Sequence, residues 1–153
     1  MAIDHELMLI AIEQAREAEE HGEVPIGAVL VDASGQVLAV GRNRTIGDSD
    51  PTAHAEIVAL RLGAIAVNNY RLPGCTMYTT IEPCAMCAGA LVNARISRLV
   101  YGARDERFGA VETHFRICDN DVLNHRMEIT DGVLADESRA LMQAFFRNRR
   151  GRT

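Results

Sequence analysis

Apolar residues recur at helical spacing near the start of the chain and predict a first helix over residues 4–21. The residues on this apolar side are Leu7, Ile10, Ala11, Ala15 and Ala18. Asp4 is a suitable N-cap, because its side chain can accept a hydrogen bond from a free amide of the first turn. Gly22 suits the end of the helix because glycine tolerates the left-handed backbone found there.

Two short runs rich in β-forming residues follow, at 26–31 (IGAVLV) and 36–41 (QVLAVG). The segment between them, Asp32–Gly35, consists largely of turn-forming residues. The pattern therefore predicts a β-hairpin, and the polar residues 42–52 predict a loop after it.

The rest of the chain alternates between helical spacing and short apolar runs. We expect strands at 75–80, 97–101 and 127–130, and helices at 53–67, 84–95 and 134–150. This alternation predicts an α/β protein in which helices cover both faces of a mixed five-stranded sheet, a three-layer αβα sandwich. The last helix is amphipathic, and its apolar side contains Leu134, Leu141, Phe145 and Phe146.

Length and composition fit a single domain over residues 1–153, because 153 residues with 48% hydrophobic content can bury one core. The first residues lack the pattern of a signal peptide, and no apolar run is long enough to span a bilayer. We therefore expect a cytoplasmic protein with no membrane partner. Four cysteines are too few for a disulfide scaffold and suit reduced thiols or metal ligands.

The net charge of −5 is not typical of a protein that coats nucleic acid. A local basic patch is nevertheless present at the C-terminus, formed by Arg147, Arg149, Arg150 and Arg152. All 16 basic residues are arginine, so the absence of lysine excludes Schiff-base chemistry and lysine general bases.

Two segments carry residues suited to metal chemistry: His54-Ala55-Glu56 and Pro83-Cys84-Ala85-Met86-Cys87, each at the start of a predicted helix. Cys84 and Cys87 are three residues apart, so one helical turn places both thiols on the same side. One histidine would complete three protein ligands and leave a coordination position for water, which is the arrangement of catalytic zinc sites. Both helix N-termini carry partial positive charge, which favours the thiolate forms of the cysteines.

Each segment alone has simpler interpretations. A lone C-x-x-C is also typical of a redox pair, or of half a structural zinc site completed by Cys75, Cys118 or His114. A lone His-x-Glu is typical of a solvated helix start. The two together favour an open metal site with Glu56 as the base, and Cys75 and Cys118 are then small core residues. Phe145 and Phe146 suit core packing as well as base stacking.

The combination H-x-E and P-C-x-x-C is the signature of zinc-dependent nucleobase deaminases. Over nearly its whole length the chain resembles the bacterial tRNA-specific adenosine deaminase family. The segments that carry the resemblance are EVPIGAVLV, the run from Asn43 to Arg61, NYRL, EPCAMCAGA, YGARD, LNHR, EITDGVLADE and the final FFR and RR. The resemblance implies a cytidine-deaminase-like fold, a homodimer and one zinc ion (Zn2+) per chain.

The resemblance also implies roles at the matching positions. Zinc is expected to be bound by His54, Cys84 and Cys87, and protons are expected to be moved by Glu56. The reaction is then hydrolysis at C6 of the wobble adenosine in a tRNA anticodon stem-loop, which gives inosine. An unpaired loop base can leave its stack and enter a pocket, whereas a base inside a duplex cannot.

The resemblance implies further residues that contact the RNA. Asn43 is expected to bind the flipped base and Asp105 the sugar or backbone of the target nucleotide. The expected apolar walls of the pocket are Ile26, Ile46 and Ile81. The residues of the terminal helix expected to touch the stem-loop are Phe146, Arg149 and Arg150.

The chain departs from this family in one region. Asp105-Glu106-Arg107 replaces the frequent Asp-x-Lys, and Gly109–Thr113 replaces G-A-x-G-S. Segment 106–120 therefore weakens the assignment of the substrate but not the assignment of the chemistry. The alternatives are a deaminase of free guanine or cytosine, a redox-active or structural zinc protein, and a non-catalytic RNA-binding subunit, which the retained Glu56 argues against.

Overall fold

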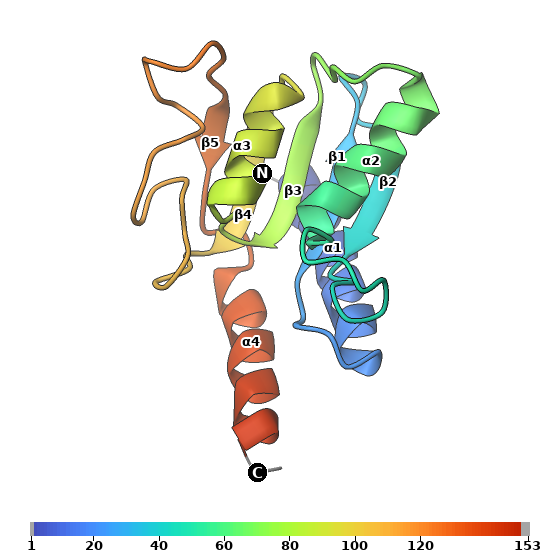
Figure 1. The fold of residues 1–153 in the computed structure, drawn as a ribbon, viewed down its shortest axis with the longest axis vertical. Helices are drawn as coiled ribbons and strands as arrows, with labels where there is room; N and C mark the ends of the chain where they lie inside the picture. Colours follow the sequence, from blue (N-terminus) through green and yellow to red (C-terminus); the bar gives the residue numbers. More distant parts are fainter. Residues whose placement is uncertain (1, 151–153) are drawn as a thin grey trace.

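One mixed sheet organises residues 2–150, the part of the chain that the computed structural model describes (Figure 1). In chain order the elements are α1 (Ala2–Glu20), β1 (Gly27–Val31), β2 (Val37–Arg42), α2 (Ala55–Val67), β3 (Thr76–Ile81), α3 (Ala85–Asn93), β4 (Arg98–Ala103), β5 (Glu128–Thr130) and α4 (Ala135–Arg150).

The five strands lie in the order β2-β1-β3-β4-β5. β1 is antiparallel to both of its neighbours, whereas β3, β4 and β5 run parallel. The sheet is thus mixed and five-stranded, as the sequence predicts. Each predicted helix and strand is present, with bounds within two residues of those expected.

Helices cover both faces of the sheet: α2 and α3 lie on one side, and α1 and α4 on the other (Figure 1). β1 shows why this is necessary. Successive side chains of a strand point to opposite faces, and all five β1 residues are buried. Ala28 and Leu30 pack in the core that includes α2 and α3, while Val29 and Val31 pack against α1. The predicted αβα sandwich is confirmed, and no helix within residues 2–150 has the length and apolar character to cross a membrane.

The first helix ends where the sequence predicts but begins differently. Gly22 has a φ of 77°, and the amides of Gly22 and Glu23 donate to carbonyls of the last helical turn, at Glu19 and Ala18. The prediction that Asp4 caps the N-terminus is wrong, because α1 begins at Ala2 and Asp4 lies within its first turn.

Asp4 is instead buried in an ion pair that joins three elements. Its carboxylate accepts hydrogen bonds from the guanidinium of Arg98 on β4, at 2.8 and 2.9 Å, and from the hydroxyl of Tyr78 on β3, at 2.7 Å. The hydrogen bond from Arg98 is the main cause that lowers the pKa of Asp4. These partners lie far away in sequence, so local helix signals do not reveal them.

Replacing Arg98 by leucine is expected to lower the free energy of unfolding by about 3 kcal/mol, because the Asp4 carboxylate would stay buried without its partner. The measurement is urea denaturation of the zinc-loaded protein. Arg104→Leu is the control, since the pair of Arg104 with Asp131 is exposed on both sides and should contribute little to stability. Equal losses in the two variants would contradict the structural role of the buried pair.

Candidate active site

A cavity of about 470 Å³ lies beside the N-termini of α2 and α3, where β3 and β4 end. Every layer of the fold supplies part of its wall, including α4 from the opposite face of the sheet. The lining residues are Val24, Ile26, Asn43, His54, Ala55, Glu56, Ile81, Glu82, Cys84, Asp105, Arg107, Phe108, Met142 and Phe146.

The candidate metal ligands occupy equivalent positions on two helices. His54 is the N-cap residue of α2 and Cys84 is the N-cap residue of α3, each with an extended backbone. Cys87 lies in the first turn of α3 and is fully buried. The ligands therefore meet at the positive ends of two helix dipoles, which stabilises thiolate charge.

The geometry of the three ligand atoms fits a tetrahedral zinc ion. The Sγ atoms of Cys84 and Cys87 lie 3.6 and 3.5 Å from Nδ1 of His54, and all three atoms lie within 4.8 Å of one another. Zn–S and Zn–N bonds of about 2.3 and 2.0 Å at tetrahedral angles would place sulfur and nitrogen about 3.5 Å apart.

The structure separates the four cysteines into a pair beside His54 and a pair in the core. Among the described residues, the group of three or more potential metal ligands contains His54, Cys84 and Cys87 only. Cys75 and Cys118 are buried in the core, and all four cysteines are free. A zinc ion bound by these three residues would keep a coordination position for water, whereas a closed structural site needs a fourth protein ligand.

Without a metal, the two thiols form a coupled pair. The hydrogen bond with Cys87 is the main cause that lowers the pKa of Cys84 to about 4, and His54 lowers it further. The same bond and burial raise the pKa of Cys87. A divalent cation held between the sulfur atoms would stabilise both thiolates.

Glu56 lies in the wall of the cavity, two residues after His54, and is not part of the ligand group. Its side chain is buried, and this burial raises the pKa of Glu56 to about 7, with a further contribution from the charge of Cys84. A carboxyl group in this position can exchange protons with a molecule that enters the cavity.

Asn43 lines the cavity and carries a buried polar atom without a hydrogen-bond partner. The residue is 6% exposed, and its side-chain Oδ1 is buried with no hydrogen-bond partner in the part of the chain that the structure describes. Its backbone amide donates to the carbonyl of Ile26, which extends the β1–β2 pairing up to the cavity. A buried acceptor without a partner costs free energy, and a ligand that donates an N–H would recover it.

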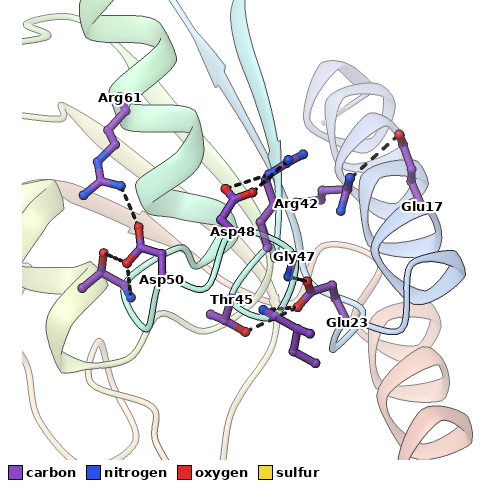
Figure 2. A network of polar contacts seen from close by, with 11 residues as sticks. Glu17, Glu23, Arg42, Thr45, Gly47, Asp48, Asp50 and Arg61 are labelled. Atoms are coloured by element: carbon purple, nitrogen blue, oxygen red, sulfur yellow. Dashed lines mark hydrogen bonds and ion pairs between the residues drawn. The ribbon is translucent and has the colours of Figure 1, made fainter.

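A buried carboxylate fixes the loop that follows Asn43 (Figure 2). Glu23 accepts hydrogen bonds from the backbone amides of Ile46, at 3.1 Å, and Gly47, at 2.7 Å, and it also faces the hydroxyl of Thr45. Ion pairs of Arg44 with Asp48 and of Arg61 with Asp50 brace the same loop from outside (Figure 2). The wall that carries Asn43 is thus held in place before any ligand binds.

A second buried carboxylate fixes the opposite wall. Glu82 accepts hydrogen bonds from the amides of Asp105, Val111, Glu112 and Thr113 and from the hydroxyl of Thr113. Burial raises the pKa of Glu82, but these hydrogen bonds outweigh it, so the net pKa lies below the ordinary value. Glu82 therefore holds the loop after β4 in one conformation.

The structure places five of the predicted substrate residues around the cavity: Ile26, Asn43, Ile81, Asp105 and Phe146. Oδ1 of Asp105 accepts hydrogen bonds from the amides of two following residues, Arg107 and Phe108, so part of this carboxylate is used within its own loop.

The remaining predicted substrate residues lie elsewhere. Ile46 is outside the cavity lining and 64% exposed, because its loop turns outward to bring the backbone to Glu23. The guanidinium of Arg149 lies 5.3 Å from the ring centroid of Phe145, away from the cavity. The side chain of Arg150 lies outside the described residues.

Several lining residues were not identified from the sequence as part of the site: Val24, Ala55, Glu82, Arg107, Phe108 and Met142. For two of these residues the sequence contained a pattern that could have placed them in the site. Glu82 directly precedes the Pro-Cys pair of the metal motif, and Met142 is four residues before Phe146, so both lie on one face of α4. Phe108 lies in the segment that departs from the family, and no sequence signal placed it here.

The fold and this site together define a class: an αβα sandwich with a His-Cys-Cys metal site and a buried glutamate is a zinc-dependent nucleobase deaminase. Residues 1–103 match the model of the cytidine and deoxycytidylate deaminase zinc-binding region. The chain belongs to this deaminase family, whose cofactor is zinc.

Relatives resemble the chain over nearly its whole length. A tRNA-specific adenosine deaminase of Haemophilus influenzae is 50% identical over 147 residues, covering 96% of this chain and 85% of the relative. A protein of the same name from Agrobacterium fabrum is 45% identical over 150 residues, which is 98% of each chain.

Solved structures extend the comparison. A structure from studies of A-to-I editing by tRNA:A34 deaminases at the wobble position is 45% identical, with a TM-score of 0.86 over 89% of this chain and 98% of the other. A guanine deaminase from Nitrosomonas europaea is 27% identical, with a TM-score of 0.77 over 92% of this chain and 83% of the other. The same fold thus carries enzymes named for RNA and for a free base.

Zinc content tests the ligand set. Purified protein is expected to hold about one zinc ion per chain, because three ligand atoms converge at one point. Cys84→Ala and Cys87→Ala should each lose the metal, whereas Cys118→Ala should keep it. Metal analysis of the four proteins gives the answer. Loss of zinc in the Cys118 variant would mean that a fourth ligand closes the site.

Proposed function

We propose that this protein hydrolytically deaminates adenosine to inosine at the wobble position of a tRNA anticodon. The substrate assignment rests on the sequence identity of 45–50% with tRNA-specific adenosine deaminases over almost the entire chain. The ligand geometry and the buried glutamate beside it support the chemistry. A cytoplasmic location follows from the proposed substrate.

The cavity suits a flipped purine. Ile26 and Ile81 provide apolar wall, and the unpaired Oδ1 of Asn43 can accept an N–H of the base. The edge of a base can hydrogen-bond to such protein groups only after the base has left its stack. An unpaired base in an anticodon loop can leave the stack in this way. We assign Asn43 to the base and Asp105, at the rim, to the sugar or backbone of the same nucleotide.

The chemical step converts an amine and water into a carbonyl and ammonia. Zinc bound by His54, Cys84 and Cys87 would supply Lewis-acid activation of the attacking water. Glu56 takes a proton from that water and delivers protons to the ring nitrogen and the departing amine, so that ammonia leaves C6.

We assign the RNA contacts outside the cavity to the protein surface around the cavity mouth. Phe146 lies at the cavity, and Arg149 continues the same helix, α4, which extends beyond the sheet (Figure 1). We propose that the exposed Ile46 contacts the RNA outside the pocket and does not form part of the pocket wall. Arg150 is assigned to the stem-loop on the resemblance alone.

We also propose a homodimer. Helix α2 exposes three large apolar side chains on the face of the molecule that α4 does not cover, Leu62, Ile65 and Val67. Exposed apolar side chains on one helix are typical of an interface with another protein.

Glu56→Ala is expected to keep zinc and to lose turnover by a factor of about 10² to 10⁴, because Glu56 moves protons and is not a metal ligand. Zinc analysis and inosine formation are measured on the same preparation. A zinc-free variant would show instead that Glu56 belongs to the ligand set.

The substrate is tested by turnover of an anticodon stem-loop RNA beside free adenosine, guanine and cytosine. The stem-loop is expected to be deaminated far faster, because only the RNA contacts both the cavity and the surface around it. Faster turnover of a free base would overturn the tRNA assignment and favour the free-base deaminase that the guanine deaminase structures represent.

A further inference from the structure

A second hollow of about 430 Å³ adjoins the active-site cavity. The two share Cys84, Arg107 and Phe108, and the second, an open surface hollow, is also lined by Ala85, Met86, His114 and Phe115. A polymer whose target unit occupies the first cavity can therefore reach the second with an adjoining unit. The proposed reaction gives no role to the outer residues of this hollow.

Two phenylalanine rings stand open to solvent along this path. Phe108 is 63% exposed and Phe115 is 62% exposed. The guanidinium of Arg107 lies 5.6 Å from the ring centroid of Phe108. Large exposed apolar side chains next to a site are typical of a binding surface. We name Arg107, Phe108, His114 and Phe115 the aromatic platform.

The backbone of the platform is held in place. Amides of Gly109 and His114 donate to the carbonyls of Asp105 and Gly109, each at 3.0 Å, in addition to the hydrogen bonds that Glu82 accepts. The ring of His114 lies 2.6 Å from the carbonyl oxygen of Glu106. The exposed rings thus sit on an ordered loop, and a ligand that stacks on them would pay little to order it.

We propose that the aromatic platform stacks an unpaired nucleobase that neighbours the target nucleotide in the RNA, an inference that rests on the proposed function. Flipping the target base deprives its neighbours of a stacking partner, and aromatic rings or guanidinium planes replace that partner. The flat apolar and cationic groups of the platform suit a base, and the residues that it shares with the catalytic cavity place it beside the target nucleotide. A free base has no neighbour, so the platform favours RNA over free purines.

Phe115 offers the cleaner test, because it lines the second hollow and not the active-site cavity. In the zinc-loaded Glu56→Ala background, Phe115→Ala is expected to weaken equilibrium binding of a labelled anticodon stem-loop by at least about fivefold, whereas Phe115→Tyr keeps stacking and should bind normally. In the active enzyme, Phe115→Ala should raise KM for the stem-loop and leave kcat and zinc content unchanged. Tyr70→Ala is the matched control, since Tyr70 is 73% exposed beside Arg71 but lines neither hollow.

Two further RNAs carry an abasic site immediately 5′ or 3′ of the target. With one of them, Phe115→Ala should lower the affinity by less than about twofold, because the partner of the ring is already missing. The proposal is overturned if the Phe115→Ala effect persists with both abasic RNAs, if Tyr70→Ala weakens binding equally, or if sedimentation shows that Phe115→Ala dissociates a dimer. Failure of the proposed function is distinct, because the unaltered protein would then fail to deaminate the stem-loop.

Discussion

The site depends on the meeting of two helix N-termini at one point beside the sheet. His54 and Cys84 are the residues immediately before α2 and α3, and their ligand atoms lie 3.6 Å apart. This placement requires α2 to pack very close to β2. A Cβ at Gly41 would collide with the carbonyl oxygen of Ala55, the first residue of α2, so glycine is needed at that position of the strand. The helix packing thus builds the metal site, and both helix dipoles favour the thiolate charge that it needs.

Three buried glutamates surround the metal site, and their different environments give them different roles. Glu82 accepts hydrogen bonds from a whole loop, and they outweigh burial and hold its pKa low. Glu23 likewise pairs with backbone amides of the loop on the other wall (Figure 2). Glu56 has no such set of donors, and burial raises its pKa. Glu23 and Glu82 shape the cavity, while Glu56 stays available to exchange protons.

The same arrangement explains how relatives with different substrates share one chemistry. The metal ligands and Glu56 lie on helix N-termini in the centre of the fold, whereas the rim is supplied by loops and by α4. Changes in the loop after β4 can therefore alter what enters the cavity without moving a ligand. In this chain that loop carries Arg107 and two exposed phenylalanines, Phe108 and Phe115, beside the cavity.

The sequence alone determined the order of helices and strands, the mixed sheet and which residues are candidates to bind the metal. The reason is that each depends on short-range patterns: the short apolar run of β1, the helical spacing in α2 and the three-residue separation of Cys84 and Cys87. Only the tertiary structure decided that Asp4 is a buried partner of Arg98, that Ile46 points outward, and that Glu82 and Phe108 belong to the cavity. Those outcomes depend on contacts between residues far apart in the chain, whose burial and hydrogen bonding exist only after the layers have packed.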